Sequence, residues 1–242
     1  MSDSGFPLEL AYTFAEIDRS LVMCSSTQEV CALLTSSAVR LVPGAEFAGI
    51  TELFRGRFLT RAATAQLVNG VDAIQYELGS GPCIDATSGG QTVRTNDLDA
   101  DERWPVFGPR AVAKTPVRSM LSLSIVPREL AQPTLGLNLY ATTVAAFTDA
   151  AQALATVLAA QAAIAVVAAE AREHAEQLEA ALANSREIGI AIGVMMRAHS
   201  ITRDAAFELL RAASQQTHRK LADIARDVGD TGVVGAPGPK TK

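Results

Sequence analysis

Three segments near the carboxyl end decide the organisation of this chain: REIGIAIGVMM (186–196), SITRDAAFELLR (200–211) and ASQQTHRKL (213–221). Within them, apolar side chains recur three and four positions apart, the spacing that places them on one face of an α-helix. Short amphipathic helices that follow one another closely bury these faces against each other. The pattern therefore predicts a three-helix bundle over residues 184–228.

The beginnings and ends of these helices can also be predicted. The first is the end of a long helix from Thr148 to about residue 198, because Thr148 precedes a stretch that is free of Gly and Pro over most of its length. The second helix is expected over 203–215. The third is expected over 219–228, with Thr217 or His218 as its cap.

The first half of the chain alternates between two kinds of pattern. Residues 8–41 have helical spacing with a turn-prone break at 24–27, which predicts a pair of helices. Short runs rich in β-branched and aromatic residues then predict five strands, at 47–54, 58–65, 93–95, 119–126 and 135–141. Arg55-Gly56-Arg57 is typical of a hairpin turn, and 127–133 would form a longer hairpin loop.

The long helix carries an extended apolar stripe. Its members keep a spacing of three to four residues and are Leu154, Val157, Leu158, Ile164, Val167, Leu178, Leu182, Ile188, Ile192 and Met195. A stripe this long on one helix usually needs a partner helix. With no obvious covering segment in the chain, we expect a homodimer held largely by the helix from Thr148 to about Ala198, in parallel or antiparallel pairing.

Composition indicates a globular cytoplasmic protein. Nearly half of the residues are apolar, the longest apolar stretch (150–169) is mostly alanine, and the amino terminus carries acidic residues where a signal peptide would carry Lys or Arg. These features exclude a membrane span and a secretion signal from our prediction. The three cysteines fit neither a zinc site nor a disulfide framework and are expected to be reduced.

Charge is distributed unevenly along the chain. Residues 1–183 carry 12 basic and 20 acidic side chains, a balance of −8, whereas residues 184–228 carry 7 and 5, a balance of +2. The net charge of −5 therefore hides a basic carboxyl-terminal segment. Such a segment is where an anionic partner would bind.

The carboxyl-terminal segments resemble the ANTAR family. The similarity joins Ala-x-Gly followed by Met (Ala191, Gly193, Met196), Ala-Phe-x-Leu-Leu (206–210) and Ser-Gln-x-Thr-x-Arg-Lys-Leu (214–221). The chain departs from the family at His218, where Asn is common, and at Ile192, where Lys or Thr is common. The resemblance implies binding to paired hairpins in nascent RNA and antitermination of transcription.

An upstream region resembles the GAF domains that are fused to ANTAR modules. The similarity lies in ELGSGPCIDA (77–86), in Asn96-Asp-Leu with Arg103-Trp-Pro, and in VRSML (117–121) with GLNLY (136–140). It implies an α+β, PAS-like antiparallel sheet with flanking helices that senses a signal or an unidentified small molecule. We expect a GAF domain at 1–147, a linking coiled-coil helix at 148–183, an ANTAR domain at 184–228 and a disordered tail at 229–242.

Basic and short polar side chains of the bundle are the candidate RNA contacts. His218, Arg219 and Lys220 are expected in the first turn of the last helix, where the helix dipole disfavours cations unless an anion such as phosphate binds there. Arg219 could also pair with Asp223, and the alternative for this turn is a solvated charged surface. The full candidate set is Arg186, Arg197, Arg203, Arg211, Ser214, Gln215, His218, Arg219 and Lys220. Phe207, the one aromatic residue among them in sequence, has the phase of a core residue.

No catalytic or cofactor site is expected. Cys83 is interpreted as a buried thiol that starts a helix after Gly-Pro, Trp104 as a structural anchor, and the acidic run from Asp97 to Glu102 as a solvated loop without a calcium-site pattern. The sequence therefore predicts no enzyme, no cofactor and no metal. Two alternatives to RNA binding remain: a dimeric DNA-binding regulator with a helix-turn-helix, and a ligand-binding module whose bundle only dimerises.

Overall fold

The computed structural model describes residues 8–126 and 134–232. The chain divides into two compact units between Arg172 and Glu173, within one long helix. The predicted loop at 127–133 and most of the predicted tail lie outside the described residues.

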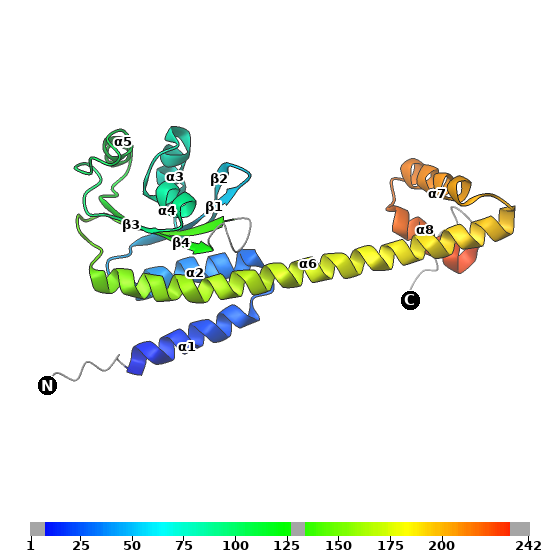
Figure 1. Ribbon diagram of the computed structural model, residues 1–242, viewed down its shortest axis with the longest axis horizontal. Helices are drawn as coiled ribbons and strands as arrows, with labels where there is room; N and C mark the ends of the chain where they lie inside the picture. The colour runs from blue at the N-terminus through cyan, green and yellow to red at the C-terminus, as the bar shows by residue number, and fades with distance from the viewer. Residues whose placement is uncertain (1–7, 127–133, 233–242) are drawn as a thin grey trace. The chain divides into compact units, whose positions relative to one another are not determined.

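The first unit is built on one antiparallel sheet with helices on both faces (Figure 1). Its strands are β1 (Phe47–Phe54), β2 (Arg57–Ala63), β3 (Thr92–Thr95), β4 (Ser119–Val126) and β5 (Thr134–Ala141), in the order β2-β1-β5-β4-β3. The five predicted strands are confirmed, with small shifts at their ends. The predicted turn is confirmed as well, because Arg55 and Gly56 have positive φ angles of 51° and 78° and Phe54 pairs with Arg57 across it.

Each face of the sheet has its own apolar core. The predicted helix pair, α1 (Leu8–Met23) and α2 (Thr27–Leu41), packs on one face together with the first part of α6 (Asp149–His199). Successive side chains of β5 point to opposite faces of the sheet. Leu135, Leu137 and Leu139 therefore enter this core, whereas Tyr140 enters the core on the other face.

Helices α3 (Gln66–Leu78), α4 (Pro82–Gly89) and α5 (Phe107–Lys114) cover the other face. The sequence predicted a helix that starts at Cys83 after Gly81-Pro82, and α4 begins one residue earlier, at Pro82. It did not predict α3 or α5, and both contain residues that disfavour helix: Gly70 in α3 and Gly108-Pro109 in α5. Packing on the sheet outweighs that local cost.

The long helix α6 starts and ends as predicted, with the Thr148 hydroxyl accepting a hydrogen bond from the Ala151 amide at 3.2 Å. The expectation that its apolar stripe lacks cover within the chain is wrong for part of its length. Leu158 is fully buried in the core under the sheet, together with the alanines that line the same side between 151 and 169. By length and composition alone α6 would also pass as a membrane span, and one side of its first part is buried in the core of the first unit.

The rest of the stripe has two fates. Ile192 and Met195 enter the core of the second unit, with Ile188 packed against it. Ile164, Leu178 and Leu182 are 76%, 55% and 63% exposed and meet no cover among the described residues. Periodicity alone predicted one environment for all positions of the stripe. The structure shows three: the core of the first unit, the core of the second unit and the exposed surface of α6.

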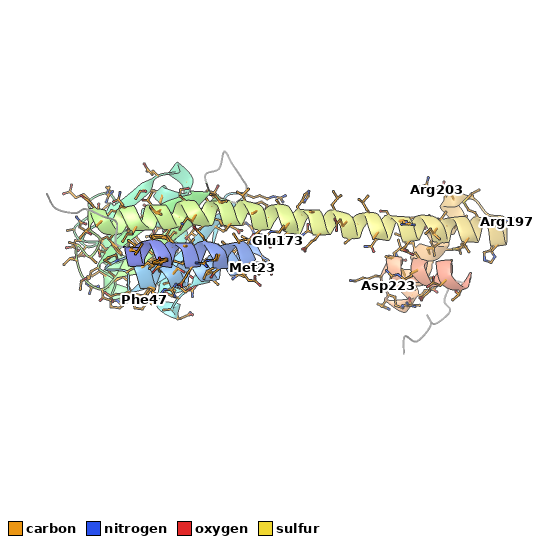
Figure 2. The ribbon with its side chains drawn as sticks, turned by 90° about the horizontal axis from the view of Figure 1, so that it is seen from below. Met23, Phe47, Glu173, Arg197, Arg203 and Asp223 are labelled. Atoms are coloured by element: carbon orange, nitrogen blue, oxygen red, sulfur yellow. The ribbon has the colours of Figure 1, made fainter. Side chains whose placement is uncertain are left out.

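The second unit is the predicted three-helix bundle. The end of α6 packs with α7 (Arg203–Thr217) and α8 (Leu221–Thr231) around Met195, Leu210 and Val228. Figure 2 shows Arg197 near the end of α6 and Arg203 at the start of α7. Thr202 caps α7, and its hydroxyl accepts a hydrogen bond from the Ala205 amide at 3.3 Å.

The bounds of α8 differ from the prediction at both ends. The helix begins at Leu221 instead of residue 219, because His218 adopts the left-handed conformation and Lys220 is extended at the cap position. It also continues through Gly229 to Thr231, so these residues are not part of a disordered tail. The glycine that ends it is Gly232, whose φ is 73° and whose amide donates to the Val228 carbonyl at 2.8 Å.

Candidate functional site

The turn between α7 and α8 gathers four of the candidate residues. The Ser214 hydroxyl donates a 2.6 Å hydrogen bond to the Arg219 carbonyl, which ties the end of α7 to the turn. His218 ends α7 with a φ of 54°. A left-handed residue here explains why Asn is common at this position of the family, because Asn tolerates that conformation better than most residues. Ser214 is therefore a structural contact as well as a candidate.

Arg219 and Lys220 precede α8 and do not lie in its first turn. Lys220 occupies the cap position, and no side chain there accepts a hydrogen bond from the amides of the helix start. Both side chains belong to exposed residues. This helix start has no side-chain cap and follows two cations, and its first turn carries one carboxylate, that of Asp223. The amides and the dipole of a helix start favour negative charge, so an anion could still bind there.

Arg219 has a different partner from the one that the sequence suggested. Its guanidinium lies 2.8 Å from the Asp227 carboxylate, whereas Asp223 lies 3.5 Å from Arg226. The same Asp227 oxygen has no partner of hydrogen-bond geometry, so the contact is an ion pair without a well-aligned hydrogen bond. Since the Asp227 side chain is 12% exposed and that of Arg219 is 42% exposed, Arg219 neutralises a mostly buried charge while keeping part of its surface open.

The remaining arginines do not join this turn. Arg211 pairs with Glu208 at 2.7 Å, and both side chains are more than half exposed, so the pair adds little stability. Arg186 and Arg197 are exposed on α6 and form no ion pair within the described residues. Gln215 is also exposed, near the end of α7.

Arg203 lies at the opposite end of α7 from the turn. Eleven residues separate it from Ser214, which is roughly 16 Å along an α-helix. The structure therefore distributes the candidates over at least two places on the bundle, one at the α7–α8 turn and one at the start of α7.

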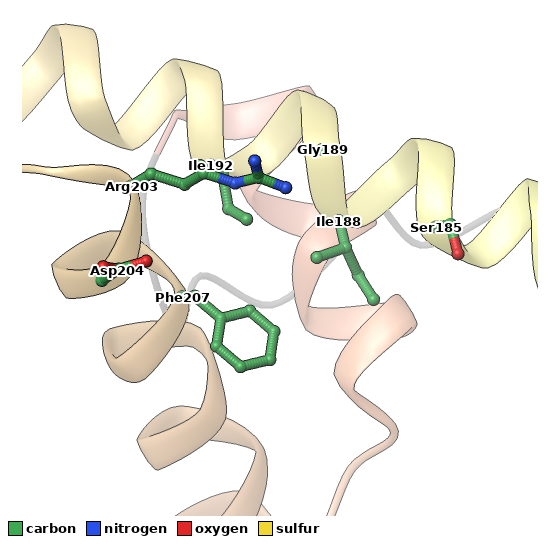
Figure 3. A pocket seen from close by; sticks show the side chains of 7 residues that line it. All are labelled: Ser185, Ile188, Gly189, Ile192, Arg203, Asp204 and Phe207. Carbon is green, nitrogen blue, oxygen red and sulfur yellow. The ribbon is translucent and has the colours of Figure 1, made fainter.

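A pocket of about 490 Å³ opens between α6 and the start of α7 (Figure 3). Ile188, Gly189 and Ile192 line it from α6, and Arg203, Asp204 and Phe207 line it from α7. The prediction that Phe207 belongs to the core is wrong, because its residue is 37% exposed. The core face of α7 is formed by its neighbours Ala206 and Leu210, and this leaves the Phe207 ring at the pocket.

Sequence analysis missed a buried polar network in the first unit. Asp72 of α3 is fully buried and accepts hydrogen bonds from the hydroxyls of Tyr140, Thr60 (2.8 Å) and Tyr76 (3.5 Å). No ion pair to Asp72 exists within the described residues. Burial raises the pKa of its carboxyl to about 6, although the three hydroxyl bonds oppose that shift. The sequence signal that could have indicated this network is a polar residue at an inward position of a strand, such as Tyr140.

The cysteines show no sign of activation. All three are buried, and burial raises the pKa of each thiol, most strongly at Cys83, where the Asp72 carboxylate adds to the effect. Reactive thiols need the opposite shift. Cys83 lies in the first turn of α4, as interpreted from the sequence.

Two further interpretations of the first unit can be compared with the structure. Trp104 is buried and its indole donates to the Asp85 carboxylate at 2.9 Å, which confirms a structural anchor. In the acidic run, Asp101 pairs with Arg103 at 2.6 Å, and that guanidinium lowers the pKa of Asp101 to about 2. The described residues contain no cluster with the composition of a metal site.

Comparisons with known proteins match both units. A family model of the GAF domain matches residues 24–167, and a model of the ANTAR domain matches residues 176–228. No curated protein sequence matches the chain.

Solved structures share the fold of the first unit at low sequence identity. The GAF domain of a phosphoenolpyruvate-protein phosphotransferase from Coxiella burnetii is 13% identical with a TM-score of 0.54, covering 69% of this chain and 98% of its own. Free methionine-R-sulfoxide reductase from Neisseria meningitidis is 16% identical with a TM-score of 0.51, covering 70% and 95%. The bacteriophytochrome RpBphP3 from R. palustris is 10% identical with a TM-score of 0.55, covering 88% and 48%. At these identities the likeness concerns the fold alone.

Proposed function

We propose that the protein is a signal-responsive regulator of transcription, because the chain belongs to the GAF domain family and carries an ANTAR domain on the carboxyl-terminal side of the GAF domain. GAF domains sense signals and ANTAR domains bind RNA in antitermination. In our proposal the protein acts in the cytoplasm, where it binds hairpins in nascent transcripts and favours continued transcription. Neither domain type is catalytic as a class.

The observation that carries this proposal is the uncapped start of α8. Lys220 stands where Ser, Thr, Asp or Asn would cap a helix, and Arg219 precedes it. Asp223 lies in the first turn of α8, as stability favours, but the cap position itself carries a cation instead of a capping residue. The arrangement is explained when phosphate groups of an RNA complete the site.

We also propose that the protein acts as a homodimer through α6. Val157, Ile164 and Leu178 are exposed and differ by multiples of seven residues, and Leu182 follows Leu178 by four. Exposed apolar positions at this spacing are those that a coiled coil buries. Two copies of the RNA-binding bundle in one dimer would suit paired hairpins.

DNA binding is the alternative, and one observation favours it. Three residues (218–220) join α7 and α8, a connection length typical of a helix-turn-helix. Against it, the outer surface of α8 carries Asp223, Asp230 and the paired Arg226, which would bring more acid than base toward the phosphates of a major groove.

One binding experiment distinguishes these functions. RNAs that copurify with the full chain are identified, and a hairpin from them is compared with duplex DNA of the same sequence in filter binding at two salt concentrations. We expect tight binding of the hairpin alone. Preference for the duplex would favour the DNA alternative, and failure to bind either would leave a sensor whose bundle only dimerises.

A further inference from the structure

The pocket between α6 and α7 has the size of a small-ligand site and an aromatic wall. Its volume of about 490 Å³ falls within the roughly 300–1,000 Å³ that binding pockets occupy. Phe207 supplies the wall, and Figure 3 shows its ring on the pocket side of α7, facing Ile188. Phe207 is 37% exposed as a residue, so its ring at the pocket offers a stacking surface that the described chain does not fully cover.

The wall opposite Phe207 is opened by a glycine. Gly189 lies within a long helix, where glycine costs roughly 1 kcal/mol of stability relative to alanine. A Cβ added at this position would meet no atom within 4 Å, so close packing inside the chain does not require the glycine. A large side chain at this position would take up part of the space that the glycine leaves in the wall of the pocket.

Two opposite charges flank the same pocket without neutralising each other. Arg203 and Asp204 are exposed neighbours in the first turn of α7, and neither forms an ion pair or a side-chain hydrogen bond with any described residue. Figure 3 shows the Arg203 guanidinium extended toward α6 and the Asp204 carboxylate on the pocket side of α7. The start of α7 thus presents the donors of Arg203 and the acceptors of Asp204 to the pocket, beside a stacking surface.

We propose that this pocket takes a single unstacked guanine base from the loop of the bound RNA. The inference rests on the proposed RNA-binding function and adds a specificity site to it. The base stacks on Phe207, as single-stranded bases do on aromatic side chains. Arg203 faces the phosphate or the carbonyl edge of the same nucleotide, since guanidinium groups match both.

The choice of guanine follows from the Asp204 carboxylate, which can only accept hydrogen bonds. The Watson–Crick edge of guanine presents two adjacent donors, N1–H and the N2 amino group. Adenine and cytosine each place an acceptor beside their one amino group, and uracil places its one N–H between two acceptors. Guanine is therefore the base that satisfies both oxygens of one carboxylate.

The test uses the full chain and hairpins from its copurifying RNAs, in which each loop guanosine is replaced in turn by adenosine or by inosine, which lacks the N2 amino group. We expect one loop position where the wild-type protein prefers guanosine roughly 10- to 100-fold over adenosine, with inosine between them. Asp204→Asn should remove most of that preference, because it replaces one of the two acceptor oxygens by an NH₂ group that can only donate.

Two further variants test the pocket itself. Phe207→Leu should weaken hairpin binding roughly 5- to 150-fold, the range measured for loss of base stacking. Gly189→Leu should fill the space beside the ring and weaken binding similarly while leaving the bundle at least as stable to heat. The matched control is Gly193→Leu, one turn further along α6, where an added Cβ also meets no atom within 4 Å but no lining residue of the pocket is changed.

The outcomes separate this inference from the function on which it rests. Hairpin binding that survives in Phe207→Leu and Gly189→Leu, or that falls equally in the Gly193→Leu control, would overturn the pocket and leave RNA binding in place. Indifference to every loop guanosine would also overturn it. Loss of dimer in Phe207→Leu, seen by sedimentation, would assign the pocket to a second copy instead. A wild-type protein that binds no RNA would overturn both proposals.

Discussion

Asp72 offers a quantitative test of how the first unit is held together. Its carboxylate is fully buried, accepts three hydroxyl hydrogen bonds and has no cation beside it within the described residues. Burial raises its pKa from 3.8 to about 6, a shift worth about 3 kcal/mol at about 1.4 kcal/mol per pKa unit. Since the folded state holds this proton more tightly than the unfolded state, the group contributes stability as the pH falls below about 6, until the unfolded carboxyl is protonated too.

The perturbation is Asp72→Asn, which removes the titration and keeps one acceptor oxygen. The quantity measured is the unfolding free energy of the wild type minus that of the variant, in which the contributions of the other titrating groups cancel. This difference should increase by about 2 kcal/mol when the pH is lowered from about 7.5 to about 4.5. Tyr140→Phe, which removes one donor to the carboxylate, should shift the change to higher pH, because that hydrogen bond lowers the pKa of Asp72.

Urea unfolding followed by tryptophan fluorescence measures this quantity in the right part of the molecule. Trp104 is the single tryptophan of the chain and lies in the same apolar core as Tyr140. A wild-type minus variant difference that stays constant between the two pH values would refute the argument, since it would mean that Asp72 ionises in the folded protein as it does in water.

Other predictions concern the second unit and α6. Arg219→Ala should lower the thermal stability of the bundle by about 1 kcal/mol, because it leaves the mostly buried Asp227 without its counter-ion, and adding Asp227→Asn should restore it, as measured by circular dichroism. Lys220→Ala should spare stability but flatten the slope of log affinity against log salt for hairpin RNA by roughly 0.7 to 0.9, and an unchanged slope would exclude a phosphate contact. His218→Gly should stabilise the bundle by roughly 0.5–1 kcal/mol, because glycine adopts the left-handed conformation without strain, and a loss of stability would assign the imidazole a packing role. Leu182→Glu should dissociate the proposed dimer in sedimentation, and an intact dimer would place the interface elsewhere.

Strong local patterns made most of the fold predictable from sequence. The strands of the first unit alternate sides with period two, the turn at Arg55-Gly56 needs positive φ angles, and α6 continues as long as no helix breaker intervenes. The missed helices, α3 and α5, have weak local signals, and their stability comes from packing on a sheet whose position no local pattern contains.

The candidate site was less predictable because its geometry depends on contacts between helices. The start of α8 is shifted by the left-handed His218 and by the bond from Ser214 to the Arg219 carbonyl. Phe207 has a phase that suits a core, but the adjacent Ala206 and Leu210 take that role once three helices are in place. The periodicity of apolar residues identifies an apolar helix face, but it does not show which other helix covers that face.

The middle of α6 has a consequence for how the protein responds to its own concentration. Residues 171–186 contribute no side chain to any apolar core of the described chain. In a monomer this segment keeps its helix by local propensity and by continuity with the packed helix on both sides, without tertiary contacts of its own in an apolar core. In the proposed dimer a second copy would cover it, so the same sixteen residues would bend and fray more easily in the monomer than in the dimer. Mass action would then set the stiffness of the helix that connects the two units.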